Sequence, residues 1–278
     1  PSNTATNNSI ENEIKDKNKE IVREEEYRVQ VLRWGVDSLY LSYQGDLHDE
    51  VNLELQRLKS LAQSEDKDQQ ALAQYVIGDH IFEVSDKGSG LFTFVLEDNA
   101  FRIALSKPNK AVPMAFVKIS SEYLNHKTPV EAEQALKQVL SQLGVLISDA
   151  NVSRIDIYVD FASDMAMDTW SRQAWVTRAS SISQYAVDQQ FTGWAIGQGS
   201  VISARLYNKI VEIISSDKGY MIPLWKQAGW DASLPVWRLE FQFKRQFLDQ
   251  KGIVNLRAVL DHLNGLWSYA MTEWLKLT

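Results

Sequence analysis

The sequence predicts an α+β fold, with a curved, largely antiparallel sheet and helices on one face. Short strand-like segments are separated by Gly, Asp and Pro-Asn turn signals, which is typical of hairpin-connected strands. Strands and helices come in mixed order, as expected for an α+β protein. Strands followed by a helix recur in each half of the chain, which leaves an internal duplication open.

The composition is that of a soluble globular protein. The chain has 278 residues, 45% of them hydrophobic and 23% charged, which suits one large domain or two small ones. We expect no membrane span, because no apolar run approaches about 20 residues, and no secretory signal, because the N-terminus is polar. The chain has no cysteine, which excludes disulfide and thiolate chemistry and favours a cytoplasmic location.

The domain organisation follows from a change in composition near residue 28. Residues 1–27 are rich in Asn, Glu and Lys and are expected to form a disordered or loosely helical tail. Residues 28–278 form the predicted globular domain, beginning with a strand-like segment at Arg28. Further strands are expected at 80–85, 91–96, 100–106, 113–119, 152–161, 191–197, 200–208 and 235–244. Helical segments are expected at 47–63, 128–144, 168–178, 209–228 and 253–276.

The helix over 128–144 has the clearest end signals. Thr128 can cap it, Pro129 fits its first position and Glu131 completes the spacing of a capping box. Gly144 is placed to end it.

Three of the predicted strands share an unusual polar face. In "RIDIYVD" the alternate residues are Arg154, Asp156, Tyr158 and Asp160; in "ARLYNK" they are Arg205, Tyr207 and Lys209; in "WRLEFQFK" they are Arg238, Glu240, Gln242 and Lys244. Each row begins with Arg, and a carboxylate or phenol follows two residues later. A plain solvent face is the general alternative for any one strand.

These residue types suit a phosphodiester site. Asp156, Asp160 and Glu240 offer the oxygen ligands that Mg²⁺ or Mn²⁺ prefers. Tyr207 could attack phosphorus and form a covalent link. Arg205 and Lys209 could stabilise the developing charge, and we expect Arg154, Arg238 and Lys244 to bind DNA phosphates. Trp225 and Trp230 are candidates for stacking on bases.

At these motifs the chain resembles the replication initiation factor family, the rolling-circle initiators of plasmids and phages. "GWAIGQGSVISARLYNK" is similar to that family's Arg-x-Tyr-x-Lys segment, "SRIDIYVDF" to its Arg-x-Asp-x-x-x-Asp strand and "VWRLEFQFKRQFL" to its Arg-x-Glu strand. The only histidines are the isolated His48, His80, His126 and His262, so the resemblance is to the carboxylate-using branch, related to some conjugative-element relaxases.

The resemblance implies a replication initiator that nicks one DNA strand at an origin and forms a 5′-phosphotyrosine link through Tyr207. It implies Mg²⁺ or Mn²⁺ as cofactor, plasmid or phage origin DNA in single-stranded or hairpin form as partner, and a helicase as a further partner. A homodimer is also open.

The charge balance leaves two alternatives to the nicking enzyme. The net charge of −7 disfavours nucleic-acid binding, although residues 201–278 hold 10 Lys and Arg against 7 Asp and Glu. The chain could instead be a non-catalytic DNA-binding regulator on the same scaffold, or a protein whose sheet face meets another protein.

Overall fold

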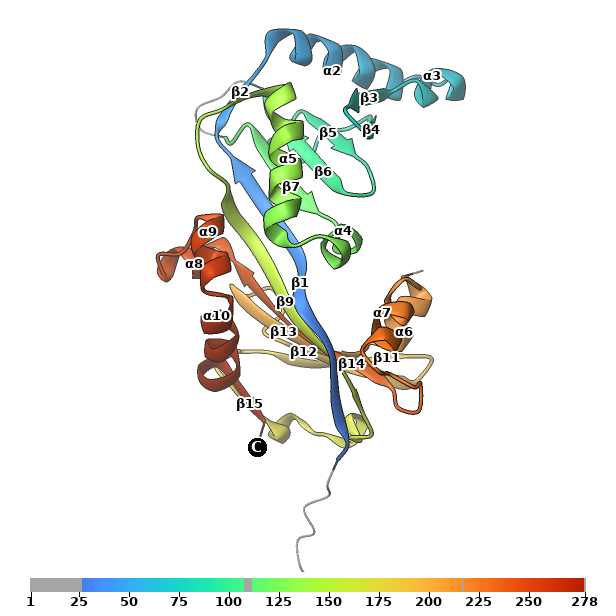
Figure 1. Ribbon diagram of the computed structural model, residues 1–278, viewed down its shortest axis with the longest axis vertical. Helices are drawn as coiled ribbons and strands as arrows, with labels where there is room; N and C mark the ends of the chain where they lie inside the picture. Colours follow the sequence, from blue (N-terminus) through green and yellow to red (C-terminus); the bar gives the residue numbers. More distant parts are fainter. Residues whose placement is uncertain (1–26, 108–111, 217, 278) are drawn as a thin grey trace, which may run out of the picture.

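Two long strands form the spine of the molecule. The computed structural model describes residues 27–107, 112–216 and 218–277. Strands β1 (Val29–Tyr43) and β9 (Asn151–Ser163) pair antiparallel along most of their length and run side by side through both halves of the molecule (Figure 1). They lie at the centre of an 11-stranded sheet in the order β11-β12-β13-β14-β9-β1-β7-β6-β5-β4-β3.

The N-terminal half of the molecule extends the sheet from β1. Its strands are β3 (Gln74–Ile77), β4 (His80–Val84), β5 (Phe94–Glu97), β6 (Phe101–Leu105) and β7 (Ala115–Ile119). Its helices are α2 (Asp49–Ala62), α3 (Lys67–Ala71), α4 (Ser121–His126) and α5 (Pro129–Leu143). Helix α5 packs on the sheet through Ala132, Leu136 and Leu140, which are fully buried against the core.

The C-terminal half extends the sheet from β9. Its strands are β11 (Ile182–Val187), β12 (Gln190–Ile196), β13 (Ile202–Asn208) and β14 (Val236–Lys244). Its helices are α6 (Lys209–Ser215), α7 (Met221–Gln227), α8 (Arg245–Gln250), α9 (Leu256–Asp261) and α10 (Leu263–Tyr269). In the N-terminal half, β7 pairs with β1, and β6, β5, β4 and β3 follow outward in reverse chain order. In the C-terminal half, β14 pairs with β9, and β13, β12 and β11 follow outward in the same way. Such a repeat of order agrees with an internal duplication, which itself stays a prediction.

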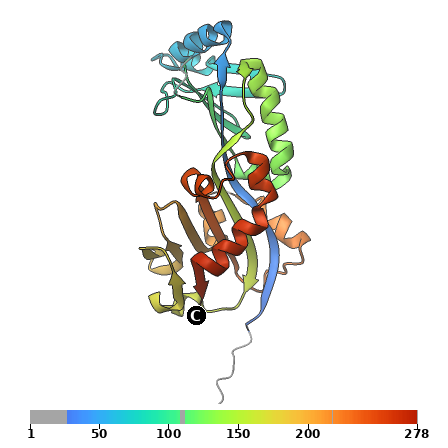
Figure 2. The ribbon, with the colours of Figure 1, turned by 90° about the vertical axis from the view of Figure 1, so that its left-hand side faces the viewer.

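The α+β class and the largely antiparallel sheet are confirmed, but helices lie on both faces of the C-terminal half. Phe241 and Phe243 pack on Trp267 of α10 and Phe247 of α8, so these helices cover the apolar face (Figure 2). On the other face, Trp225 of α7 bonds to Asp160 of β9. Trp225 belongs to a small second core, together with Leu32, Ala162, Ile213, Met221 and Val236. The prediction of helices on one face is therefore wrong for this half.

Most other elements follow the sequence prediction. The capping box of α5 is present, with Thr128 and Glu131 bonding each other's backbone. The predicted helix over 168–178 is wrong: two short 3₁₀ turns lead into strand β10 (Trp175–Thr177), because Trp175 is buried against Trp170 and Trp194. The C-terminal helix is broken after α10 by a π-helical turn, Ala270–Trp274, and ends in β15 (Leu275–Leu277), which pairs with β10. The predicted tail lies outside the described residues except for Tyr27.

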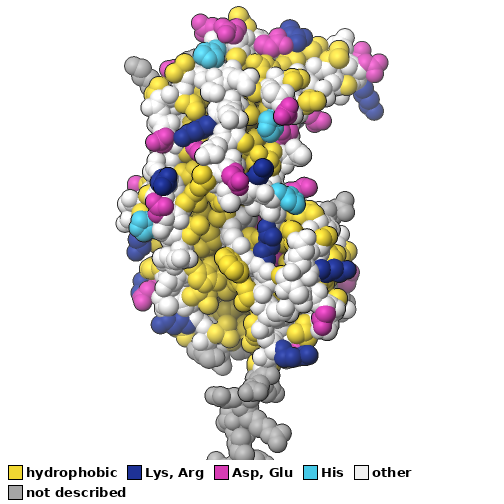
Figure 3. Space-filling view, viewed as in Figure 1, with side chains coloured by type: hydrophobic (Ala, Val, Ile, Leu, Met, Phe, Trp, Pro, Cys, Tyr) yellow, Lys and Arg dark blue, Asp and Glu magenta, His cyan; other side chains and the backbone are white. Residues whose placement is uncertain are grey.

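An apolar pocket opens on the face covered by α10. Its volume is about 350 Å³, and it lies between β1 and the C-terminal segment, where hydrophobic side chains gather at the surface (Figure 3). Val29, Val31 and Met271 are among its exposed lining residues. Two further strands, β2 (Gly45–Leu47) and β8 (Gly144–Leu146), pair beside α5. In the described part of the chain, no helix has the length and apolar character needed to cross a membrane.

Candidate active site

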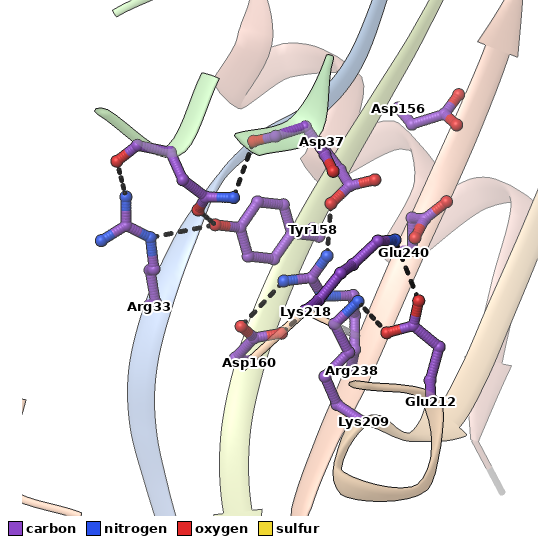
Figure 4. A network of polar contacts seen from close by, with 12 residues as sticks. Arg33, Asp37, Asp156, Tyr158, Asp160, Lys209, Glu212, Lys218, Arg238 and Glu240 are labelled. Carbon is purple, nitrogen blue, oxygen red and sulfur yellow. Dashed lines mark hydrogen bonds and ion pairs between the residues drawn. The ribbon is translucent and has the colours of Figure 1, made fainter. Parts of the chain in front are cut away.

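The three strands with polar rows are direct neighbours in the sheet. Strand β14 pairs with β13 on one side and with β9 on the other. Arg205 lies opposite Glu240, and Tyr207 lies opposite Arg238. We call this side of the sheet, which carries Tyr207 and Glu240, the polar face. Figure 4 shows Asp156, Arg238 and Glu240 on this face.

The Tyr207 hydroxyl lies between the carboxylate of Glu240 and the amine of Lys209. Its hydroxyl donates a hydrogen bond to Oε2 of Glu240 at 3.2 Å. Nζ of Lys209 lies 3.5 Å from the same hydroxyl oxygen and 5.4 Å from the centre of the ring. Burial and the negative charge of Glu240 raise the pKa of Tyr207 well above its usual value, so the phenol is protonated in this state.

Glu240 and Asp156 are linked through Arg205. One Arg205 nitrogen lies 2.5 Å from Glu240 and 3.9 Å from Asp156. Arg154 donates to both carboxylate oxygens of Asp156. Burial and the nearby charge of Glu240 nevertheless outweigh the two arginines and raise the pKa of Asp156 to about 6. Two carboxyl groups therefore share this site with two cations.

The third predicted acid, Asp160, belongs to a separate buried cluster. It accepts hydrogen bonds from Nε and Nη2 of Arg238 at 2.6 and 2.9 Å and from the indole of Trp225 at 3.0 Å. Arg238 also bonds Asp37, and its guanidinium carbon lies 3.7 Å from the centre of the Tyr158 ring. Because Arg238 and Asp160 are both 0% exposed, neither can contact DNA.

This cluster buries three residues for which the sequence predicts a binding role. Arg238, for which the sequence predicts phosphate binding, and Asp160, for which it predicts metal binding, lie inside the protein, where each neutralises the other. Trp225 is also fully buried and cannot stack on a base. Within the described ranges, no group of three or more His, Asp or Glu side chains is placed to hold a metal ion.

Lys209 and Lys244 complete the set of predicted site residues. Lys209 is buried, and its Nζ forms an ion pair with Glu212 at 2.5 Å. Burial and the charge of Arg238 lower the pKa of Lys209 despite that partner. Lys244 is half-buried and donates to the carbonyl of Gly199 at 2.9 Å.

Three charged residues of this region were missed by the sequence analysis. Glu212 binds both Lys209 and Lys218, and Asp37 binds Arg238. Glu212 lies three residues after Lys209 at the start of a helical segment, and that spacing could have indicated their ion pair. Asp37 precedes the polar rows by more than 100 residues, and nothing local in the sequence connects it to Arg238.

The site opens into a pocket of about 420 Å³. Its lining includes Arg205, Tyr207 and Glu240, together with Tyr185 and Val187 of the β11–β12 hairpin. Gly193 lies directly opposite Tyr207 in the adjacent strand. A Cβ atom there would lie 2.5 Å from the carbonyl of Leu206 and 2.7 Å from Cβ of Tyr207, so only glycine fits.

Comparisons with known proteins give one structural similarity to report. No protein-family model matches the chain, and the search of curated proteins finds no significant match. A solved structure of a rolling circle replication initiator protein from Geobacillus stearothermophilus aligns with a TM-score of 0.48 and 13% identity. The alignment covers 90% of this chain and 87% of that one. A similarity of this degree carries no information about the chemistry of individual residues.

Proposed function

We propose that the protein is a rolling-circle-type replication initiator that cleaves one DNA strand through Tyr207. The observation that carries the proposal is the position of the Tyr207 hydroxyl, 3.2 Å from a carboxylate and 3.5 Å from a lysine, on a residue that lines an open pocket. A nucleophile, a proton acceptor and a cation thus meet at one point where a phosphate can enter.

The proposed step is an attack of the Tyr207 oxygen on the phosphorus of a phosphodiester. A bond forms between that oxygen and phosphorus, and the bond from phosphorus to the 3′ oxygen breaks. The phenolic proton passes to Glu240, and the leaving 3′ oxygen takes a proton from solvent. The product is a 5′-phosphotyrosine with a free 3′ hydroxyl.

The raised pKa of Tyr207 sets a requirement on this step. A neutral phenol is a weak nucleophile, so the proton must leave as the bond to phosphorus forms. Glu240 is within hydrogen-bond reach for this role. Arg205 is half-exposed in the pocket and is placed to bind the phosphate oxygens as negative charge develops.

Asp156 and Glu240 are the residues that would hold Mg²⁺ or Mn²⁺, with Glu240 using Oε1, because its Oε2 faces the Tyr207 hydroxyl and takes the proton. Magnesium is commonly bound by one or two carboxylates together with phosphate oxygens of the substrate, so this pair suffices without Asp160. Burial first, and the charge of Glu240 second, raise the pKa of Asp156, and a divalent cation held between the two carboxylates would stabilise their charged forms. When bound, such an ion supplies polarisation of the scissile phosphate.

Cleavage of a random-sequence single-stranded DNA library in Mn²⁺ tests the proposal without knowledge of the origin. Wild-type protein is expected to give shortened products and a covalent protein–DNA adduct, and Tyr207→Phe neither. Tyr75→Phe, at the far edge of the sheet on β3, is the matched control and should cleave like the wild type. Salt-sensitive binding with no cleavage by any variant would instead identify a non-catalytic DNA-binding regulator.

A further inference from the structure

A row of directly paired residues crosses five neighbouring strands on the polar face. From β14 to β6 the row consists of Lys244, Arg154, Tyr40, Lys118 and Arg102. Four of the five are cations. Because strands in a sheet are spaced by about 4.8 Å, the row spans about 19 Å. It leads from the edge of the candidate active site into the N-terminal half.

The row lies at the surface, unlike Arg238 and Lys209. Lys118 is exposed, and the other four residues are half-buried. On the opposite face of the same strands, Leu39, Val117 and Ile103 are fully buried in the core. The row ends at Glu97 of β5, whose carboxylate lies 3.3 Å from Arg102. The cationic part is therefore confined to β14, β9, β1, β7 and β6.

Aromatic rings accompany the cations. The ring centres of Tyr40 and Phe116 are 6.0 Å apart, and those of Phe116 and Phe92 are 5.8 Å apart. The Arg154 guanidinium lies 5.1 Å from the centre of the Tyr40 ring. All three rings are half-exposed, and Leu91 beside them is 76% exposed. Exposed aromatic rings next to cations are the usual means of binding unpaired bases and their phosphates.

Arg154 connects the row to the active site. Its guanidinium holds Asp156, and Asp156 lies 3.9 Å from Arg205 in the pocket. A DNA strand whose scissile phosphate lies at Arg205 and Tyr207 would thus meet Arg154 next and then Lys118 and Arg102.

We propose that the polar face from β14 across β9 and β1 to β7 and β6 binds the single-stranded DNA that flanks the cleavage site. Lys244, Arg154, Lys118 and Arg102 contact its phosphates, and Tyr40, Phe116 and Phe92 stack on its bases. The identification of the strand as the one that is cleaved rests on the proposed function, whereas the binding surface itself does not.

The test measures binding of fluorescein-labelled oligothymidylate by anisotropy over a range of salt concentrations. The double variant Lys118→Ala/Arg102→Ala is expected to lower the slope of log affinity against log salt by about 1.4, since each single-strand phosphate contact contributes about 0.7. Phe116→Leu is expected to weaken binding about fivefold or more, through loss of stacking. The matched control is Lys251→Ala/Arg257→Ala, which removes two exposed cations near helices α8 and α9 on the other side of the sheet.

The outcomes separate this inference from the proposed function. Equal slopes for the two double variants, or no oligonucleotide binding by wild type at low salt, would overturn the binding surface; the second result would point to a protein partner. If Tyr207→Phe abolishes cleavage while Lys118→Ala/Arg102→Ala binds like its control, the function stands and the surface is wrong. If no variant cleaves but that double variant still shows the reduced slope, the surface stands without the function.

Discussion

Removing the buried carboxylate of Asp160 should destabilise the protein far more than removing an exposed one. In Asp160→Ala, Arg238 loses both short hydrogen bonds to that carboxylate and the Trp225 indole loses its acceptor. Arg238 remains fully buried, with Asp37 as its remaining carboxylate. Breaking a buried ion pair by removing one partner typically costs about 3–5 kcal/mol, because the other charge is left in a poorly solvating interior.

Asp164→Ala is the matched control. Asp164 lies just beyond the same strand and pairs with Arg28 at 2.8 Å, but the two side chains are 35% and 70% exposed. An exposed pair of this kind contributes about 0–1 kcal/mol. The same substitution, made four residues apart, should therefore differ by several kcal/mol in the free energy of unfolding.

Urea and thermal unfolding followed by circular dichroism measure the difference. A loss of 3–5 kcal/mol corresponds to a fall in Tm of about 6–20 °C for a protein of this size. Replacing both partners in Arg238→Met/Asp160→Leu should recover part of the loss, since apolar residues of similar volume need no counter-charge. If Asp160→Ala and Asp164→Ala unfold alike, the assignment of Arg238 to the interior is wrong, and Arg238 returns as a candidate for phosphate binding.

Two further substitutions test the site. Gly193→Ala should lower the rate of cleavage by about 100-fold, because the added Cβ displaces Tyr207 and a shift of about 1 Å suffices for such a loss. The control is Gly265→Ala in α10, where a Cβ meets nothing within 4 Å, and it should cleave like the wild type. Equal rates for the two variants would contradict the close approach of Gly193 to Tyr207. Burial favours a raised pKa for Glu212, but bonds from Lys209 and Lys218 lower it to about 2, so its contribution to stability is complete above its ordinary value of 4.5 and is lost as the pH falls toward 2. Glu212→Gln should therefore lower the free energy of unfolding at pH 7 by about 1–2 kcal/mol and make it depend less on pH between 4.5 and 2. A pH dependence equal to that of the wild type would show that the ion pairs of Glu212 do not stabilise the protein.

Local patterns in the sequence were enough to predict the three strands of the site and the start of helix α5. The alternation in β9, β13 and β14 placed Tyr207 and Glu240 on one face, and Thr128, Pro129 and Glu131 fixed the start of α5. Such signals act within a few residues, so they can be recognised without the fold.

Long-range packing decided what the sequence did not predict. Arg238 and Glu240 lie two residues apart on the same face of β14. Arg238 is nevertheless neutralised by Asp160 in the interior, whereas Glu240 faces the pocket. That difference arises because α7 places Trp225 over Asp160, a contact between residues 65 positions apart. The segment 168–178 likewise forms turns and a strand because Trp175 packs on Trp194, which helical spacing cannot reveal.

The most direct test of the account identifies the residue that becomes attached to DNA. The covalent adduct formed with the single-stranded library is digested with trypsin and nuclease, and the modified peptide is sequenced by mass spectrometry. We predict a phosphate-linked nucleotide on Tyr207 and on no other tyrosine. An adduct on a different residue, or one that persists in Tyr207→Phe, would contradict the central claim that this phenol is the nucleophile.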